Sequence, residues 1–185
     1  IGVCHTATAS PGGSGALYLA AANYADRGSK VLLRDRHWGP YDGFLAGCGL
    51  GIATYPLLNE SSALDLDSLR TELDTLSNSQ NKVMSWLNDP AHNPTGLSLS
   101  KEERMSVLQT FTNAAMKHEN VGYTLLIDAA YHLYAEEPHG WAETITDALH
   151  DGMAWPANLL ITFAISLSKS HTVYGLRGGA LVTIH

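Results

Sequence analysis

Short apolar runs alternate with segments of helical periodicity along the whole chain. The apolar runs predict seven strands, over Ile1–Ala9, Lys30–Arg34, Ile52–Leu58, Val83–Leu87, Tyr123–Ile127, 159–167 and Ala180–Ile184. Helices are predicted over Ala16–Asp26, Phe44–Cys48, Leu66–Leu76, the segment that a capping box at Ser100 opens, and 142–150. This alternation is typical of an α/β fold, in which helices cover both faces of a mostly parallel sheet. We therefore expect a three-layer αβα domain.

Candidate functional residues follow the carboxyl ends of several predicted strands. In parallel sheets, ligands bind beyond these ends, so residues far apart in the sequence meet at one edge. The residues in such positions are Gly13, Trp38, Asn93, Asp128 and Lys169. Their shared placement predicts a ligand site at that edge.

The sixth strand leads into the polar stretch Ser166–Ser170, which contains Lys169 and is followed by Arg177. A lysine amine forms a Schiff base with a carbonyl, and hydroxyls with a guanidinium hold a phosphate. Both features suit pyridoxal 5'-phosphate (PLP). The alternative for this stretch alone is a solvated lysine in a polar loop.

Each of the other candidates also has a structural explanation. The glycine-rich stretch Ser10–Gly15 either aims free backbone N–H groups at an anion or only forms a turn. Trp38 either stacks on a planar ligand or covers the edge of the core, and Asn93 either binds a ligand or shapes its proline-flanked turn. Asp128 is less ordinary, because a carboxylate that closes an apolar strand needs a partner.

Composition narrows the function classes. The net charge of -7 and the lack of a basic block argue against a nucleic-acid partner. No apolar run reaches the ~18 residues of a membrane span. The cysteines Cys4 and Cys48 suggest reduced thiols in a cytoplasmic protein, and the histidines lack the spacing of metal ligands, so we expect no metal site. Because the chain starts without methionine, we expect an excised domain or a fragment.

Three motifs, residues 91–96 (AHNPTG), 128–131 (DAAY) and 166–169 (SLSK), occur in that order and are followed by Arg177. Together they resemble the fold-type-I PLP-dependent aminotransferases, above all the aspartate and aromatic branch, and the likeness covers essentially the whole chain. The resemblance implies that residues 1-185 form the PLP-binding large domain. It also implies that the N-terminal segment and the small domain of the family are absent from this chain.

The resemblance also implies a role for each candidate. Lys169 would hold PLP as a Schiff base, Asp128 would pair with the pyridine nitrogen, and Tyr131 with Asn93 would bind the phenolic oxygen. Trp38 would stack on the ring. The implied phosphate ligands are Gly13, Ser14, Ser166 and Arg177, with Ser168 in support. The catalytic residues expected on this basis are Lys169, Asp128 and Tyr131.

The implied activity is ping-pong transamination between an amino acid and a 2-keto acid in a homodimer, with Lys169 moving the proton. Two residues depart from the aspartate enzymes. A glycine opens the phosphate-binding stretch in place of a serine, and Tyr41 stands where many of them have a histidine that supports the aspartate. The arginine that grips the substrate carboxylate is expected in the absent small domain, so we expect the isolated chain to be inactive.

Two alternatives stay open. A Rossmann NAD-binding domain would explain the glycine-rich stretch and Asp35, but the glycines lack the G-x-G-x-x-G spacing and the other motifs are left unexplained. A non-catalytic fragment that keeps the sheet but binds no cofactor is the other alternative.

Overall fold

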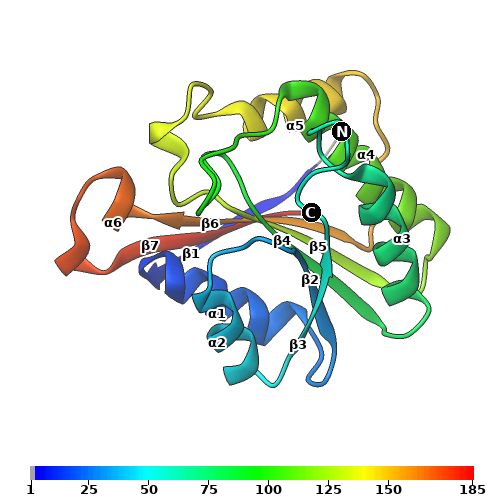
Figure 1. The fold of residues 1–185 in the computed structure, drawn as a ribbon, viewed down its shortest axis with the longest axis horizontal. Coiled ribbons are helices and arrows are strands. Elements are labelled where there is room, and N and C mark those ends of the chain that lie inside the picture. Colours follow the sequence, from blue (N-terminus) through cyan, green and yellow to red (C-terminus); the bar gives the residue numbers. More distant parts are fainter. Residues whose placement is uncertain (1–2) are drawn as a thin grey trace.

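One mixed sheet organises the protein, whose computed structural model describes residues 3–185. Within these residues, seven strands lie in the order β1-β7-β6-β5-β4-β2-β3 (Figure 1). Their bounds are β1 His5–Pro11, β2 Lys30–Arg34, β3 Gly51–Tyr55, β4 Lys82–Asn88, β5 Gly122–Asp128, β6 Leu159–Ser166 and β7 Gly178–Ile184. Strand β7 is antiparallel to both of its neighbours, and the other pairings are parallel. The expected α/β class with a mostly parallel seven-stranded sheet is confirmed.

The strand register brings several carboxyl ends to one edge. Asn88, the last residue of β4, pairs with Asp128, the last residue of β5. Asp128 in turn lies opposite Ala164, two residues before the end of β6. Strand β1 runs parallel to β6, because both are antiparallel to β7, so Pro11 reaches the same edge.

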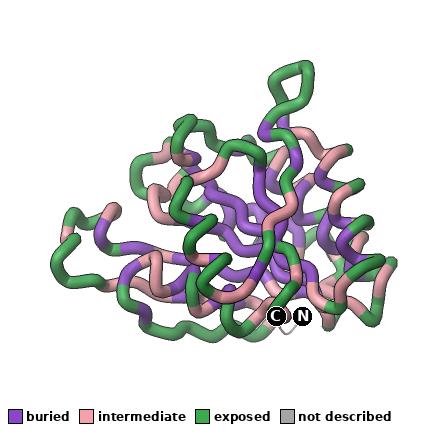
Figure 2. The backbone as a smooth tube through the Cα atoms, turned by 60° about the horizontal axis from the view of Figure 1, so that its bottom comes forward, coloured by how far each residue is buried: buried purple, intermediate pink, exposed green. Residues whose placement is uncertain are grey.

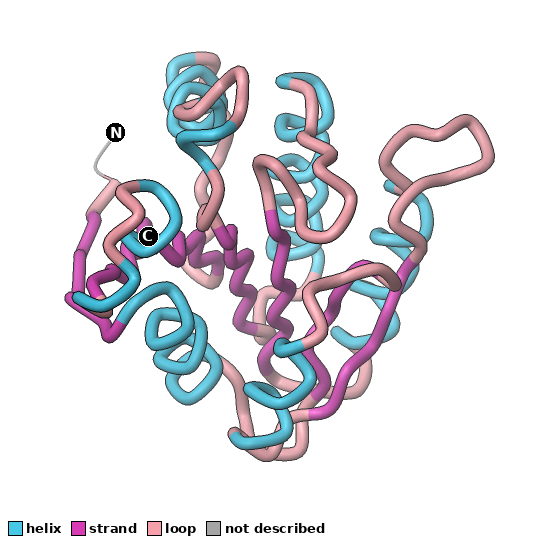
Figure 3. The backbone as a smooth tube through the Cα atoms, turned by 60° about the vertical axis from the view of Figure 1, so that its left-hand side comes forward, coloured by secondary structure: helices cyan, strands magenta, loops and turns pink. Residues whose placement is uncertain are grey.

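Helices cover both faces of the sheet (Figures 1 and 3). One face carries α1 (Gly12–Tyr24) and α2 (Pro40–Gly47). The other face carries α3 (Leu66–Ser77), α4 (Lys101–Lys117) and α5 (Gly140–His150). The remaining elements are short: η1 (His132–Tyr134), α6 (Leu167–Ser170) and η2 (Tyr174–Leu176). No helix within residues 3–185 has the length and apolar character needed to cross a bilayer.

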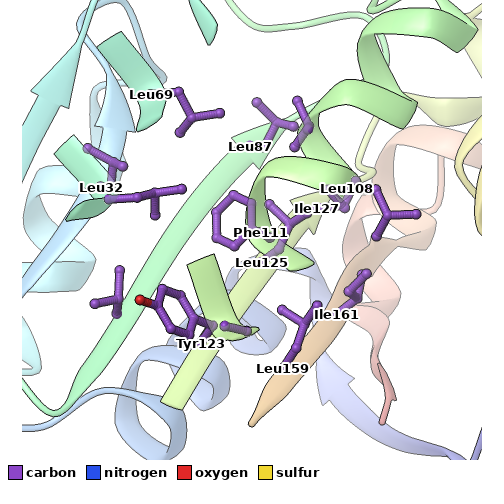
Figure 4. Close-up of a cluster of buried hydrophobic side chains, with 14 of the residues drawn as sticks. Leu32, Leu69, Leu87, Leu108, Phe111, Tyr123, Leu125, Ile127, Leu159 and Ile161 are labelled. Carbon is purple, nitrogen blue, oxygen red and sulfur yellow. The ribbon is translucent and has the colours of Figure 1, made fainter. Parts of the chain in front are cut away.

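The two faces bury separate hydrophobic clusters, and Figure 2 shows the buried segments in the interior. Alternate residues of a strand point to opposite faces. Leu87 of β4 therefore belongs to the cluster under α3, α4 and α5, which also contains Phe111 of α4 (Figure 4). Its neighbour Trp86 belongs to the cluster under α1 and α2. Because the central strands are buried on both faces, they are continuous apolar runs in the sequence.

The capping box at Ser100 is present and opens α4. The Glu103 N–H donates to the Ser100 hydroxyl over 3.2 Å, and the Ser100 N–H donates to the Glu103 carboxylate over 2.9 Å. Two orphan N–H groups at the start of the helix are thereby satisfied.

Two helices, α1 and α2, begin a full turn earlier than the sequence predicts. Helix α1 begins at Gly12 rather than Ala16, so the glycines form its first turn instead of a loop. Strand β1 reaches Pro11, beyond the predicted end at Ala9, because it pairs with β7 to that point, while Ile1 and Gly2 lie outside the described residues. Helix α2 begins at Pro40, since a proline is well suited to the first helical position.

Glycine at position 179 lets β7 approach the start of α1. A Cβ at Gly179 would lie 2.5 Å from the carbonyl carbon of Gly12, which is a backbone atom and cannot swing aside as a side chain would. The first turn of α1 therefore has its position only because residue 179 lacks a side chain.

We expect Gly179→Ala to destabilise the fold by about 1–3 kcal/mol, because the added methyl group overpacks backbone atoms. Urea denaturation measures this change. The matched control is Gly43→Ala in α2, where a Cβ meets no atom of the described residues within 4 Å. There, alanine should be neutral or stabilising, by roughly 0.5–1 kcal/mol. Equal midpoints for the two variants would contradict the close-approach argument.

Candidate active site

A cleft of about 200 Å³ opens at the carboxyl edge of the sheet. It is lined by every site residue that the sequence predicts, namely Gly13, Ser14, Trp38, Asn93, Asp128, Tyr131, Ser166, Ser168, Lys169 and Arg177. Residues that sequence reasoning did not select also line it: Leu17, Asn88, Ala130 and Tyr174. Residues from separate segments of the chain thus converge on one space.

Asp128 lies buried in the cleft and has two hydrogen-bond donors. The Tyr41 hydroxyl donates to Oδ2 over 2.6 Å, and the Ala130 N–H donates to Oδ1 over 3.1 Å. Burial raises the pKa of the Asp128 carboxyl, while both hydrogen bonds act in the opposite direction. A carboxylate here gains from any further donor or cation that enters the cleft.

Tyr41 remains a neutral donor. Burial, reinforced by the charge of Asp128, raises the pKa of its phenol well above the ordinary value. The ring also packs edge-on against Trp86, with centroids 5.0 Å apart. The resemblance drawn from the sequence singles out Tyr41 only as a departure from an expected histidine, and the structure shows its direct contact with the aspartate.

Hydrogen bonds of Asn88 connect the Asn93 loop to the end of β5. The Asn88 side-chain amide donates to the backbone oxygen of Asp128 over 2.9 Å, and its oxygen accepts the Asn93 N–H over 2.6 Å. The Asn93 amide then reaches the Tyr131 hydroxyl over 3.4 Å. Asn93 therefore shapes its turn through the backbone and faces the cleft with its side chain. Asn88 was not predicted, although its position at a strand end was the available signal.

Asp89 anchors the same loop from the other side. The Leu99 N–H donates to Oδ1 over 2.8 Å, and the Trp141 indole donates to Oδ2 over 2.7 Å. Burial raises the pKa of this carboxyl, and the two donors oppose that change. The loop that carries Asn93 is thereby fixed to α5.

The start of α1 and Arg177 form a positively polarised corner. A Cβ at Gly12 would lie 2.8 Å from Nη2 of Arg177, so the guanidinium lies against the first helical turn. Within the described residues, this turn has neither a side-chain cap nor an acidic residue, and Arg177 has no carboxylate partner. Free N–H groups beside a guanidinium favour an anion.

Two buried serines complete this corner. Arg177 Nη1 donates to the Ser168 hydroxyl over 3.4 Å. The Ser166 hydroxyl faces Gly13, since a Cβ on that glycine would lie 3.4 Å from Oγ. Hydroxyl, guanidinium and backbone N–H donors therefore gather at one place.

Lys169 enters the cleft from α6. Its Nζ lies 4.8 Å from the ring centroid of Tyr174 and 5.6 Å from that of Tyr131. The hydroxyl of the neighbouring Tyr174 is the first cause that raises the pKa of the Lys169 amine, so the amine is charged at neutral pH. Trp38 forms another wall and packs edge-on against Tyr41 at 5.6 Å, so it both covers the core and faces the cleft.

The residues that favoured a dinucleotide-binding domain have structural roles. The Asp35 carboxylate accepts the Leu57 N–H over 2.9 Å. The glycine-rich stretch spans the end of β1 and the first turn of α1, which faces the Arg177 guanidinium. In the described part of the chain, no cluster of three or more His, Cys, Asp or Glu side chains is arranged to hold a metal ion.

Comparisons with known proteins agree with this geometry. Residues 3–185 match the model of the family described as aminotransferase class I and II. The aromatic-amino-acid aminotransferase of Pseudomonas aeruginosa is 31% identical over 180 residues, which is 95% of this chain and 41% of that protein.

Solved structures of aminotransferases are also similar to this chain. An aminotransferase from Anaerococcus prevotii superposes with a TM-score of 0.87 at 32% identity, over 98% of this chain and 43% of that one. An aromatic-amino-acid aminotransferase from Burkholderia pseudomallei, covalently bound to pyridoxal phosphate, has the same fold, with a TM-score of 0.70 at 22% identity over 97% of this chain and 42% of that one.

The chain thus spans less than half the length of the relatives that it matches. The match nevertheless covers nearly the whole chain, and the sheet has the expected strand pattern. The chain therefore belongs to the aminotransferase class I and II family.

Proposed function

We propose that this chain is the PLP-binding part of an aminotransferase that exchanges an amino group between an amino acid and a 2-keto acid by a ping-pong mechanism. The observation that carries the proposal is the convergence of Lys169, the Tyr41–Asp128 pair and the Arg177 corner on one cleft. Family membership supports it, because the family is PLP-dependent. The activity of the whole protein is part of the proposal, since the chain spans 41% of the Pseudomonas relative.

The donors and acceptors of the cleft fit the polar groups of the cofactor. The anion-binding corner of Gly13, Ser14, Ser166 and Arg177, with Ser168 in support, suits the phosphate. Asp128 has the charge and burial to hold a protonated pyridine nitrogen. Asn93 and Tyr131 are positioned to bind the phenolic oxygen, and Trp38 offers a ring face for stacking. When bound, PLP withdraws electrons from the bonds of the amino acid carbon attached to it.

Lys169 has two roles in the proposed reaction. Its amine attaches the cofactor covalently in the resting enzyme, and once released it moves a proton as general base and then as general acid. Within the described residues, the amine is the only lysine nitrogen that lines the cleft. Tyr41 keeps the Asp128 carboxylate in place through both halves of the reaction.

The substrate carboxylate requires a residue beyond those that line the cleft. Arg177 is the only arginine of residues 3–185 in the lining, and it belongs to the anion-binding corner. Arg104 is buried and bound to Glu137 and the Leu99 carbonyl oxygen. We propose that the carboxylate-binding arginine lies in a part of the protein outside this chain, that the whole protein is a homodimer, and that this chain alone has negligible activity.

Lys169 should be the attachment site of the cofactor. Borohydride reduction of the chain with PLP, followed by peptide mass spectrometry, should find the reduced cofactor on Lys169, and Lys169→Ala should abolish that label. Lys101→Ala is the matched control, because Lys101 pairs with Asp147 on α5 and should leave the label unchanged. A label on Lys30, Lys82 or Lys117 would overturn the assignment.

Asp128→Asn should stabilise the cofactor-free chain at neutral pH. The folded-state pKa of Asp128 is raised by burial above its ordinary value of 3.8. The protonated Asp128 carboxyl therefore contributes its full stability below pH 3.8. This contribution is lost as pH rises through the raised folded-state pKa, because the buried group then becomes charged. Urea denaturation should show no advantage of Asp128→Asn at pH 3.5 and a growing advantage above it. Each tenfold difference in proton affinity between the folded and unfolded chain is worth about 1.4 kcal/mol.

Asp151→Asn serves as the control for this titration, because Asp151 is exposed at the end of α5. Its urea midpoint should change far less than that of Asp128→Asn, because no buried group is altered. If Asp128→Asn were less stable than the parent chain at pH 8, the carboxylate would be better satisfied than its two donors indicate.

A further inference from the structure

Three tyrosines surround Lys169, and the roles proposed above use only one of them. The rings of Tyr131 and Tyr174 lie 5.6 and 4.8 Å from Nζ, and the Tyr134 hydroxyl donates to the Lys169 backbone oxygen over 2.7 Å. A cation within about 6 Å of an aromatic centroid is attracted by the negative face of the ring. The Lys169 side chain is thus held between two ring faces while its backbone is fixed from η1.

The backbone after α6 turns back so that Tyr174 reaches the lysine. Thr172 has a φ of 54°, which a β-branched residue rarely adopts, and Arg177 has a φ of 49°. Between them, the Leu176 N–H donates to the Val173 carbonyl oxygen over 3.1 Å and forms η2. Two unfavourable conformations thus frame the short segment that presents Tyr174.

The core does not require Tyr174 in this place. Its side chain is 52% exposed, whereas the large aromatic residues of the core, such as Trp86 and Phe111, are about 1% exposed. This half-exposed ring belongs to neither hydrophobic cluster of the core, but it lines the cleft and lies against the Lys169 amine.

We propose that Tyr174 is a positioning residue whose ring face holds the charged Lys169 amine in the cleft whenever that amine is not covalently occupied. The inference rests on the proposed function, because the position of the amine matters for attaching the cofactor and for returning to it. The Tyr131 ring lies farther from the amine, and its hydroxyl is also paired with Asn93.

Other charged groups face the same space. Asp128 lines the cleft from β5 and Arg177 lines it from the start of β7, while α1 contributes only Gly13, Ser14 and Leu17. The single carboxylate favours the charged amine and the guanidinium disfavours it. Neither changes when Tyr174 is replaced, so a comparison of variants at this position isolates the ring.

The test is the pH dependence of amine acetylation in the cofactor-free chain, measured for each lysine by isotope-coded acetic anhydride and mass spectrometry. Only the neutral amine reacts, so the ring should protect Lys169. Tyr174→Leu should raise the reactivity of Lys169 at fixed pH by about two- to fivefold, the equivalent of a surface cation–π contact. Tyr174→Phe keeps the ring and loses the hydroxyl, so the reactivity of its Lys169 should lie between those of the parent chain and Tyr174→Leu.

Lys82 is the internal reference, because it pairs with Asp26 at the opposite edge of the sheet and should react equally in all three proteins. A change in the acetylation of Lys82 as well would mark a general loss of structure. Tyr134→Phe would then be the second variant, because it perturbs the Lys169 segment and leaves the Tyr174 ring in place. Superimposable Lys169 curves for the parent and Tyr174→Leu would overturn the proposal, as would a Phe variant that behaves like the Leu variant.

Borohydride labelling with PLP separates this inference from the proposed function. A label on Lys169 together with an unchanged acetylation curve in Tyr174→Leu would retain the lysine assignment and reject the positioning role. A label on another lysine would reject the assignment, whatever the acetylation curves show.

Discussion

The structure depends on a carboxylate at the end of a fully buried strand. Taking a charge out of water is costly unless the protein supplies hydrogen bonds, and from residues 3–185 Asp128 receives only those of Tyr41 and Ala130. In the first of these, Tyr41 reaches the end of β5 from the first turn of α2, which begins at Pro40. The arrangement leaves the carboxylate incompletely neutralised, with its pKa raised. Functional sites commonly retain such a cost, and a cationic ligand group would offset it.

Most of the fold could be predicted because burial on both faces leaves a plain record in the sequence. The central strands β4 and β5 are continuous apolar runs, and the candidate residues follow the strand ends, so the cleft at the carboxyl edge could be anticipated. The start of α1 could not be placed, because it depends on the close approach of Gly12 and Gly179, which leaves no local signal. The start of α2 has a local signal in Pro40, which the sequence prediction did not use.

The direction in which individual side chains point could not be predicted from the sequence either. Asn88 looks like the last residue of an apolar strand, yet its amide connects two loops of the cleft. Arg34 ends β2 and is 4% exposed, although a charged residue at a strand end ordinarily reaches solvent. Within the described residues, its Nε and Nη2 lack a hydrogen-bond partner. Arg36, two residues later, is exposed.

Backbone strain is concentrated where the chain meets the cleft. Of the four non-glycine residues within residues 3–185 that have a positive φ, Ala91 lies in the Asn93 loop, and Thr172 and Arg177 frame the segment after Lys169. Such conformations cost of order 1–3 kcal/mol each and persist only where surrounding contacts determine them. Asp89 holds the first loop through Leu99 and Trp141, and the close packing of Arg177 against α1 holds the second. A rigid sheet with anchored loops can keep these two segments in place, and the side chains they carry, Asn93 and Lys169, are the ones that the proposed chemistry needs within about an ångström of a fixed position.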